Sequence, residues 1–73
     1  MVRHEYLPPT RQLIALRAVR GFSQKDVAER LLLSTTAYSR RERGDGLFNL
    51  REINALLDMF GVPFEKIFRV RKR

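Results

Sequence analysis

Apolar residues recur along this chain at the three- and four-residue spacing of amphipathic helices, in five separate blocks. The blocks are Leu13, Ile14, Leu16 and Val19; Val27, Ala28 and Leu31; Ala37 and Tyr38; Leu50, Ile53, Leu56, Leu57 and Phe60; and Phe64, Ile67 and Phe68. No segment shows sustained alternation of apolar and polar residues, so the pattern predicts no strand. The predicted fold class is all-α, with five short helices around one core.

Capping residues and glycines separate these blocks. The expected N-caps are Thr10, Ser23, Ser34 and Asn49, and the expected stops are Gly21, Gly44 and Gly61. Short polar side chains accept hydrogen bonds at a helix start, and glycine readily adopts the left-handed conformation that ends a helix. The predicted helices cover residues 11–20, 24–32, 35–43 and 50–60, and a fifth opens at Val62-Pro63. This gives an N-terminal arm at 1–9, one domain at 10–68 and a basic tail at 69–73.

Only two or three residues separate the second and third predicted helices. A turn this short makes two helices cross steeply instead of lying antiparallel. Such a crossing needs a small residue at the contact, which Ala28 provides. Val27, Leu31, Leu33 and Tyr38 are expected to fill the angle between the helices, and the Tyr38 hydroxyl is expected to reach the surface.

The remaining positions of the third helix are short, polar or basic. They are Thr35, Thr36, Ser39, Arg40 and Arg43. This composition is expected of a helix that faces base edges and phosphates, because arginine can hold guanine with two hydrogen bonds and threonine can contact thymine methyl groups. The alternative is that the threonines merely suit a helix start and the arginines form a solvated face.

The charge balance favours an anionic partner. Fifteen Lys and Arg against eight Asp and Glu give a formal net charge of +7. Nucleic acid is the first expectation and an acidic membrane surface the second, with a solvated basic surface as the plain alternative. The chain has no cysteine, one histidine (His4) and no carboxylate cluster, so no metal, cofactor or small-molecule ligand is expected. Catalysis needs a nucleophile with a base, paired carboxylates or a metal, so we do not expect an enzyme.

The chain also lacks the features of a membrane or secreted protein. No apolar run approaches the roughly 18 residues that a transmembrane helix needs. No signal-peptide pattern opens the sequence. The expected location is the cytoplasm, at the nucleoid of a prokaryote or phage host, with no membrane partner.

Several motifs resemble the helix-turn-helix of the Cro/repressor family (Xre type). They are Ser23-Gln24, Val27-Ala28-Glu29-Arg30-Leu31, Ser34, Ser39-Arg40, Glu42-Arg43-Gly44 and the ending from Gly61 to Phe68. The resemblance covers about Arg11 to Phe68, nearly the whole chain. It implies a five-helix, lambda-repressor-like DNA-binding domain whose helix-turn-helix lies at the second and third helices.

The resemblance also implies a role for matching positions. Gln24, at the positive end of the second helix, would contact a backbone phosphate and brace the third helix. Arg17 would pair with Glu42 and tie the first helix to the third. Bases would face Thr35, Thr36 and Arg40. The full set of expected DNA-binding residues is Gln24, Ser34, Thr35, Thr36, Ser39, Arg40 and Arg43.

Two residues depart from the pattern of this family. Leu32 stands where the family usually has glycine, and a leucine in a left-handed conformation costs on the order of 1 kcal/mol. Arg41 stands where the family usually has an inward apolar residue. We expect its stem to pack and its guanidinium to reach solvent or a carboxylate such as Asp45 or Glu52.

One such domain reads too few base pairs for tight specificity, and helix-turn-helix proteins overcome this by dimerising on near-palindromic sites. The prediction is therefore a small stand-alone transcriptional regulator that binds double-stranded DNA, with repression favoured over activation. The predicted homodimer interface consists of Phe64, Ile67 and Phe68. The rival functions are an antitoxin or other protein-binding module, and RNA binding.

Overall fold

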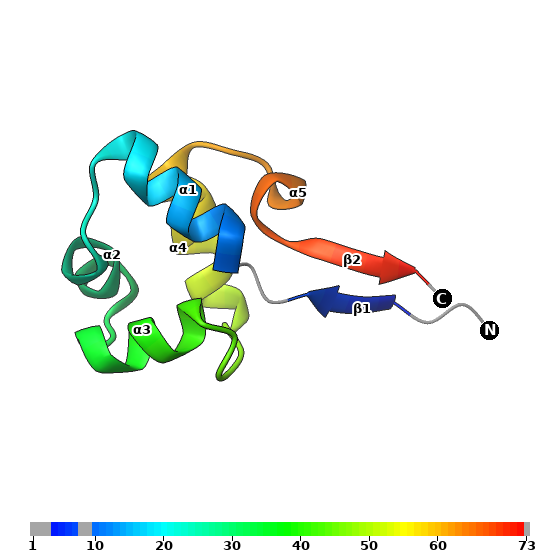
Figure 1. Ribbon diagram of the computed structural model, residues 1–73, viewed down its shortest axis with the longest axis horizontal. Helices are drawn as coiled ribbons and strands as arrows, with labels where there is room; N and C mark the ends of the chain where they lie inside the picture. Colours follow the sequence, from blue (N-terminus) through cyan, green and yellow to red (C-terminus); the bar gives the residue numbers. More distant parts are fainter. Residues whose placement is uncertain (1–3, 8–9, 73) are drawn as a thin grey trace.

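Five helices form the body of the protein in the computed structural model, which describes residues 4–7 and 10–72 (Figure 1). They are α1 (Thr10–Arg20), α2 (Gln24–Leu31), α3 (Thr35–Glu42), α4 (Leu50–Phe60) and α5 (Phe64–Ile67). The prediction of five short helices is confirmed. The second and third end one residue earlier than expected, and Thr10 is the first residue of α1 instead of its cap.

The core draws on every helix. Its buried side chains are Leu13, Val27, Ala28, Leu31, Tyr38, Leu56, Phe60, Ile67 and Phe68. Ala28 on α2 is 1% exposed and belongs to this core, as expected of a small residue between closely packed helices. Most residues of the apolar blocks therefore face one interior, as their helical spacing predicted. The prediction is wrong for Ile14, Val19 and Leu50, which are 48%, 80% and 72% exposed.

Side-chain caps fix the starts of the three central helices. The Ser23 hydroxyl accepts from the backbone N–H of Asp26 at 3.0 Å, while the Asp26 carboxylate accepts from the backbone N–H of Ser23 at 2.8 Å. Asn49 and Glu52 form the same reciprocal box at the start of α4. Ser34 accepts from the backbone N–H of Ala37 at 3.0 Å at the start of α3. The predicted caps at these three helices are confirmed, and each satisfies N–H groups that lack a partner within the helix.

The turn between α2 and α3 passes through a leucine in the left-handed region. Leu32 has φ 61° and ψ 38°, and its side chain is 78% exposed. Its backbone N–H donates to the Glu29 carbonyl at 3.2 Å, and the N–H of Leu33 donates to the Ala28 carbonyl at 2.9 Å. This pair of bonds is the Schellman arrangement, which glycine usually completes. Leu32 therefore carries the conformational strain that its position in the sequence suggested.

Two short strands lie outside the helices. The strand β1 (His4–Leu7) pairs antiparallel with β2 (Arg69–Lys72), with Tyr6 opposite Val70. Together they extend away from the helices (Figure 1). The sequence pattern did not predict these strands, because four residues are too few to show alternation and their pairing joins opposite ends of the chain. The arm and the tail thus contain paired segments where the sequence suggested only irregular chain.

None of the described helices is both long and apolar enough to cross a membrane.

Candidate nucleic-acid interface

Helix α3 has one buried side and one exposed side. Tyr38 and Glu42, four residues apart and so one above the other on the helix, are 0% and 3% exposed. The exposed residues at and after its start are Ser34, Thr35, Thr36, Arg40 and Arg43, and Ser39 beside them is half-buried. The side that carries the predicted contact residues therefore faces outward.

Among residues 10–68, no acidic side chain pairs with the two arginines on this side. Within residues 10–68, neither Arg40 nor Arg43 forms a side-chain hydrogen bond or an ion pair. Each guanidinium keeps its full set of donors for a ligand that lies against α3. Guanidinium groups suit phosphate oxygens and the acceptor edge of guanine, because both accept two parallel hydrogen bonds.

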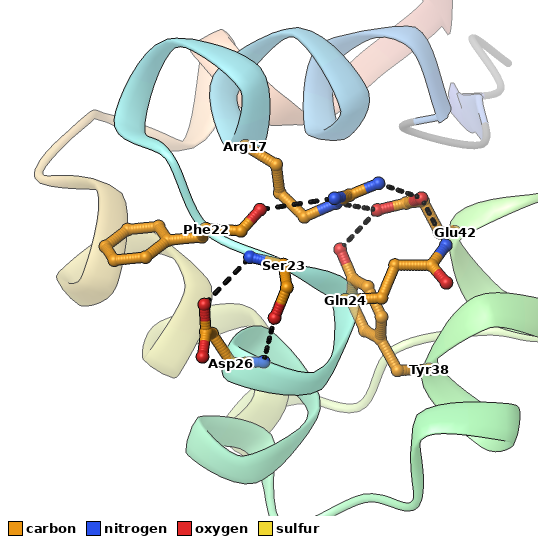
Figure 2. Close-up of polar contacts among 7 residues, drawn as sticks. All are labelled: Arg17, Phe22, Ser23, Gln24, Asp26, Tyr38 and Glu42. Atoms are coloured by element: carbon orange, nitrogen blue, oxygen red, sulfur yellow. Dashed lines mark hydrogen bonds and ion pairs between the residues drawn. The ribbon is translucent and has the colours of Figure 1, made fainter.

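The buried side of α3 is held by a single carboxylate, that of Glu42 (Figure 2). Its oxygens accept from Nε and Nη2 of Arg17 on α1 at 2.7 and 2.9 Å, and from Nε2 of Gln24 on α2 at 2.9 Å. The Tyr38 hydroxyl donates to it at 2.7 Å. Four donors from three helices therefore converge on one residue at the end of α3, which fixes where that helix lies relative to α1 and α2.

These contacts keep the carboxylate ionised. Burial alone would raise the pKa of Glu42, but the hydrogen bonds from Arg17, Tyr38 and Gln24 outweigh it and lower that pKa. The pKa of Tyr38 is raised, first by burial and then by the bond to Glu42, so its hydroxyl stays protonated and donates. The pKa of Arg17 is raised chiefly by its hydrogen bonds to Glu42. Where α1, α2 and α3 meet, Arg17 and Glu42 therefore form a charged pair, and the Glu42 carboxylate and the Tyr38 hydroxyl both have hydrogen-bond partners.

A family profile described as a helix-turn-helix domain matches residues 10–66, the whole helical body except its last residues. The chain belongs to the helix-turn-helix family. The match agrees with the crossed pair α2–α3 and with the resemblance found in the sequence, and it indicates a DNA-binding domain. No curated protein and no solved structure gives a significant match to the chain.

In this helix-turn-helix domain Gln24 is the first residue of α2 and points toward α3 (Figure 2). One N–H of its amide donates to Glu42, so Gln24 braces α3. The amide nitrogen carries a second hydrogen, which leaves a phosphate contact chemically possible at the same residue. The role as a phosphate contact stays a prediction.

A second link joins α3 of the helix-turn-helix to α4. The guanidinium of Arg41 forms an ion pair with the carboxylate of Glu52, which is 2% exposed and also accepts from the backbone N–H of Asn49 at 2.9 Å. A Cβ placed on Gly46 would lie 3.4 Å from Cγ of Arg41, so the arginine stem packs along the α3–α4 loop. Arg41 therefore follows the expectation of a packed stem and a paired head, with Glu52 as the partner.

The structure corrects two expectations about individual side chains. The Tyr38 hydroxyl does not reach the surface, since the residue is fully buried and its hydroxyl bonds to Glu42. Ile67 and Phe68 were expected to be exposed at a dimer interface, but they are 0% and 6% exposed and belong to the chain's own core. Phe64 is half-buried and stacks on Phe68 with ring centroids 5.0 Å apart. The short helix α5 and the residue after it use their apolar side chains to close a small core. None of Phe64, Ile67 and Phe68 is therefore fully exposed.

Some residues with structural roles gave no clear signal in the sequence. Arg20 donates to the Phe60 carbonyl at 2.8 Å, and Arg51 donates to the Leu31 carbonyl at 3.3 Å. Both arginines satisfy carbonyl groups at the ends of other helices, where no intrahelical donor remains. Nothing in their local sequence distinguishes them from solvated arginines. In the described part of the chain no three His, Cys, Asp or Glu residues gather as metal ligands.

Proposed function

We propose that this protein binds double-stranded DNA with sequence specificity by placing α3 in the major groove. The observation that carries the proposal is the two-sided character of α3. Its buried side is held by Glu42, and its outer side presents Arg40 and Arg43, which have no partner within residues 10–68, beside short polar residues. The major groove admits an α-helix, and short or hydrogen-bonding outer side chains suit contact with its base edges. A rigid inner side keeps those groups in a fixed position.

Each outer residue has a contact suited to its chemistry. Arg40, in the middle of the exposed side, would hold a guanine by O6 and N7, and Thr35 and Thr36 at the start of α3 would meet adjacent base edges. The remaining residues would contact phosphates. They are Gln24, Ser34, Ser39 and Arg43. The formal charge of +7 supports binding to a polyanion in general.

The positions of the aromatic residues favour duplex DNA over RNA. Sequence-specific RNA recognition stacks splayed bases on exposed aromatic rings. Here Phe22 packs against Phe60 with centroids 5.8 Å apart, and Phe48 packs against both Tyr38 and Phe68 at 6.3 and 6.2 Å. The rings of the helical body serve the core, so they offer no stacking platform.

We further propose that the protein is a homodimeric transcriptional regulator that acts in the cytoplasm on nucleoid DNA. A dimer doubles the number of base pairs read and sets its recognition helices about 34 Å apart on a near-palindromic site. Occupancy of such a site next to a promoter would repress transcription, under the control of protein concentration. This part of the proposal rests on analogy with the family.

Selection of bound duplexes from a random pool tests the proposal. We expect enrichment of a near-palindromic sequence by the wild-type protein and none by an Arg40→Ala/Arg43→Ala variant with an unchanged circular dichroism spectrum. Recovery of unrelated duplexes with no shared motif by the wild type would show that α3 does not read sequence. An Arg30→Ala/Lys25→Ala variant removes the same charge from α2 and serves as the control.

A further inference from the structure

The two-stranded sheet is the one element that the helix-turn-helix function leaves without a role. Among the described residues the sheet consists of β1 and β2 alone, so each strand has one edge without a partner. Two strands alone are marginally stable in water at best. An open edge presents free N–H and C=O groups to any strand that can pair with it. The two-stranded sheet also extends away from the helices, where another molecule can reach it (Figure 1).

We infer that the free edge of β1 pairs with β1 of a second copy of the chain, giving a four-stranded antiparallel sheet in the order β2–β1–β1–β2. The inference rests on the proposed function, because it names the surface through which the DNA-binding dimer forms. Antiparallel pairing of two identical strands is self-complementary, which is the requirement of a two-fold dimer. Backbone hydrogen bonds supply such pairing without an apolar patch on the helices.

Charge selects β1 over β2 as the shared edge. Three of the four residues of β2 are cations (Arg69, Arg71 and Lys72), so pairing two β2 strands would bring like charges together whichever way their side chains point. The strand β1 carries one acid, Glu5, with a histidine and two residues that are apolar or aromatic. Like charges opposite each other destabilise a strand pair, so the β1 edge is the favoured one.

The same reasoning fixes the register. In a two-fold antiparallel pair one residue lies directly opposite its own copy. Within His4–Leu7, a pair that matches at least three residues is centred on Glu5 or on Tyr6. Centring on Glu5 sets two carboxylates face to face, whereas centring on Tyr6 sets two aromatic residues face to face, a favourable cross-strand pair. The inferred register places Tyr6 opposite Tyr6 and Glu5 opposite Leu7.

The burial of Ile67 and Phe68 removes the surface that the sequence suggested for dimerisation. Both residues are enclosed in the core and are not available to a second copy. The free strand edge of β1 does not depend on them.

Disulfide trapping tests the inference without DNA. The chain has no cysteine, so a Tyr6→Cys variant holds a single thiol. In the inferred dimer the two copies of position 6 have Cα atoms about 4.5–5.5 Å apart, within reach of a disulfide. The control is Val70→Cys. Position 70 lies opposite position 6 in the same sheet, but in the inferred dimer it is about 14 Å from its own copy, across three strand spacings. We expect Tyr6→Cys to form covalent dimers at least about tenfold faster than Val70→Cys. Equal rates would overturn the inference.

Sedimentation at equilibrium gives a second, non-covalent test. Proline at position 6 removes an N–H from β1, so it disrupts the pairing of β1 either with its own copy or with β2. We expect a wild-type dimer and a monomeric Tyr6→Pro variant with unchanged helical circular dichroism. A wild-type monomer, or a Tyr6→Pro dimer, would contradict the inference. DNA binding is tested separately. If the inferred dimer forms but binds no duplex, the proposed function is wrong and the inferred dimer interface is not.

Discussion

The carboxylate of Glu42, at the last residue of α3, accepts two hydrogen bonds from the guanidinium of Arg17 on α1, at 2.7 and 2.9 Å. The two residues lie 25 positions apart in the sequence, and the pair is largely buried, with side chains 17% and 4% exposed. Because Tyr38 and Gln24 bond to the same carboxylate, this pair anchors the helix that we propose to read DNA.

The first prediction concerns the stability that this pair provides. Replacing Glu42 with alanine leaves the Arg17 charge without its partner in a mostly buried place, which costs about 3–5 kcal/mol of unfolding free energy. The exposed pair Arg30–Asp58, with side chains 53% and 74% exposed, is the control. Asp58→Ala should cost no more than about 1 kcal/mol, as exposed pairs do. Urea unfolding followed by circular dichroism measures both, and equal losses would show that burial does not set the strength of the Glu42 pair.

The second prediction is the response of stability to acid. The pKa of Glu42 in the folded protein is lowered from its ordinary value of 4.5, so the folded state binds the proton less readily than the unfolded state. Its contribution is therefore complete above about pH 4.5 and is lost as the pH falls through the folded-state pKa. Unfolding free energies from pH 7 to pH 3 should show the wild type and Glu42→Gln converging in acid. A constant gap between the two proteins would assign the acid sensitivity to other groups, such as Asp26, whose pKa is lowered by its bonds with Ser23.

Part of this architecture could be predicted from the sequence, because it is locally encoded. The caps at Ser23, Ser34 and Asn49 and the apolar spacing of each helix depend on neighbours a few residues away, so the helix positions followed from the pattern. The Arg17–Glu42 pair joins distant residues, and only the family resemblance suggested it. The exposed side of α3 followed from the short polar residues around Arg40.

Other features depended on the tertiary arrangement and could not be predicted. Tyr38 hides its hydroxyl because a carboxylate is buried next to it, and no local pattern records that neighbour. Ile67 and Phe68 have the same spacing whether they face a core or a partner, so their burial was not predictable from sequence. The pairing of β1 with β2 joins segments from opposite ends of the chain, and neither is long enough to show alternation.

The third prediction concerns the strained turn at Leu32. A leucine at φ 61° pays a steric cost that glycine avoids, and its side chain is 78% exposed, so little packing is lost on removal. Leu32→Gly should raise the unfolding free energy by about 1 kcal/mol. Leu32→Ala keeps the Cβ and should leave stability nearly unchanged. A thermal melt distinguishes the two, and an alanine variant as stable as the glycine variant would show that backbone strain is not the cause.

The fourth prediction is that Arg41 and Glu52 are energetically coupled. Arg41→Leu deprives the buried Glu52 carboxylate of its cation, leaving the Asn49 N–H and a distant Arg51 contact at 3.9 Å. A double-mutant cycle of Arg41→Leu with Glu52→Gln should give a coupling of about 0.5–3 kcal/mol, as residues in direct contact do. Additive effects would show that the ion pair does not hold α3 to α4.

The account as a whole depends on whether the outer side of α3 reads base pairs, and one measurement addresses that directly. The measurement is the dissociation constant of the wild type and of Arg40→Ala for every single-base-pair variant of the selected duplex. We expect Arg40→Ala to weaken binding by about 5- to 150-fold and to lose discrimination at one base pair of each half-site, in line with 1–3 kcal/mol for a bidentate contact. A uniform loss at all positions, or unchanged affinity, would contradict the claim that this helix recognises sequence.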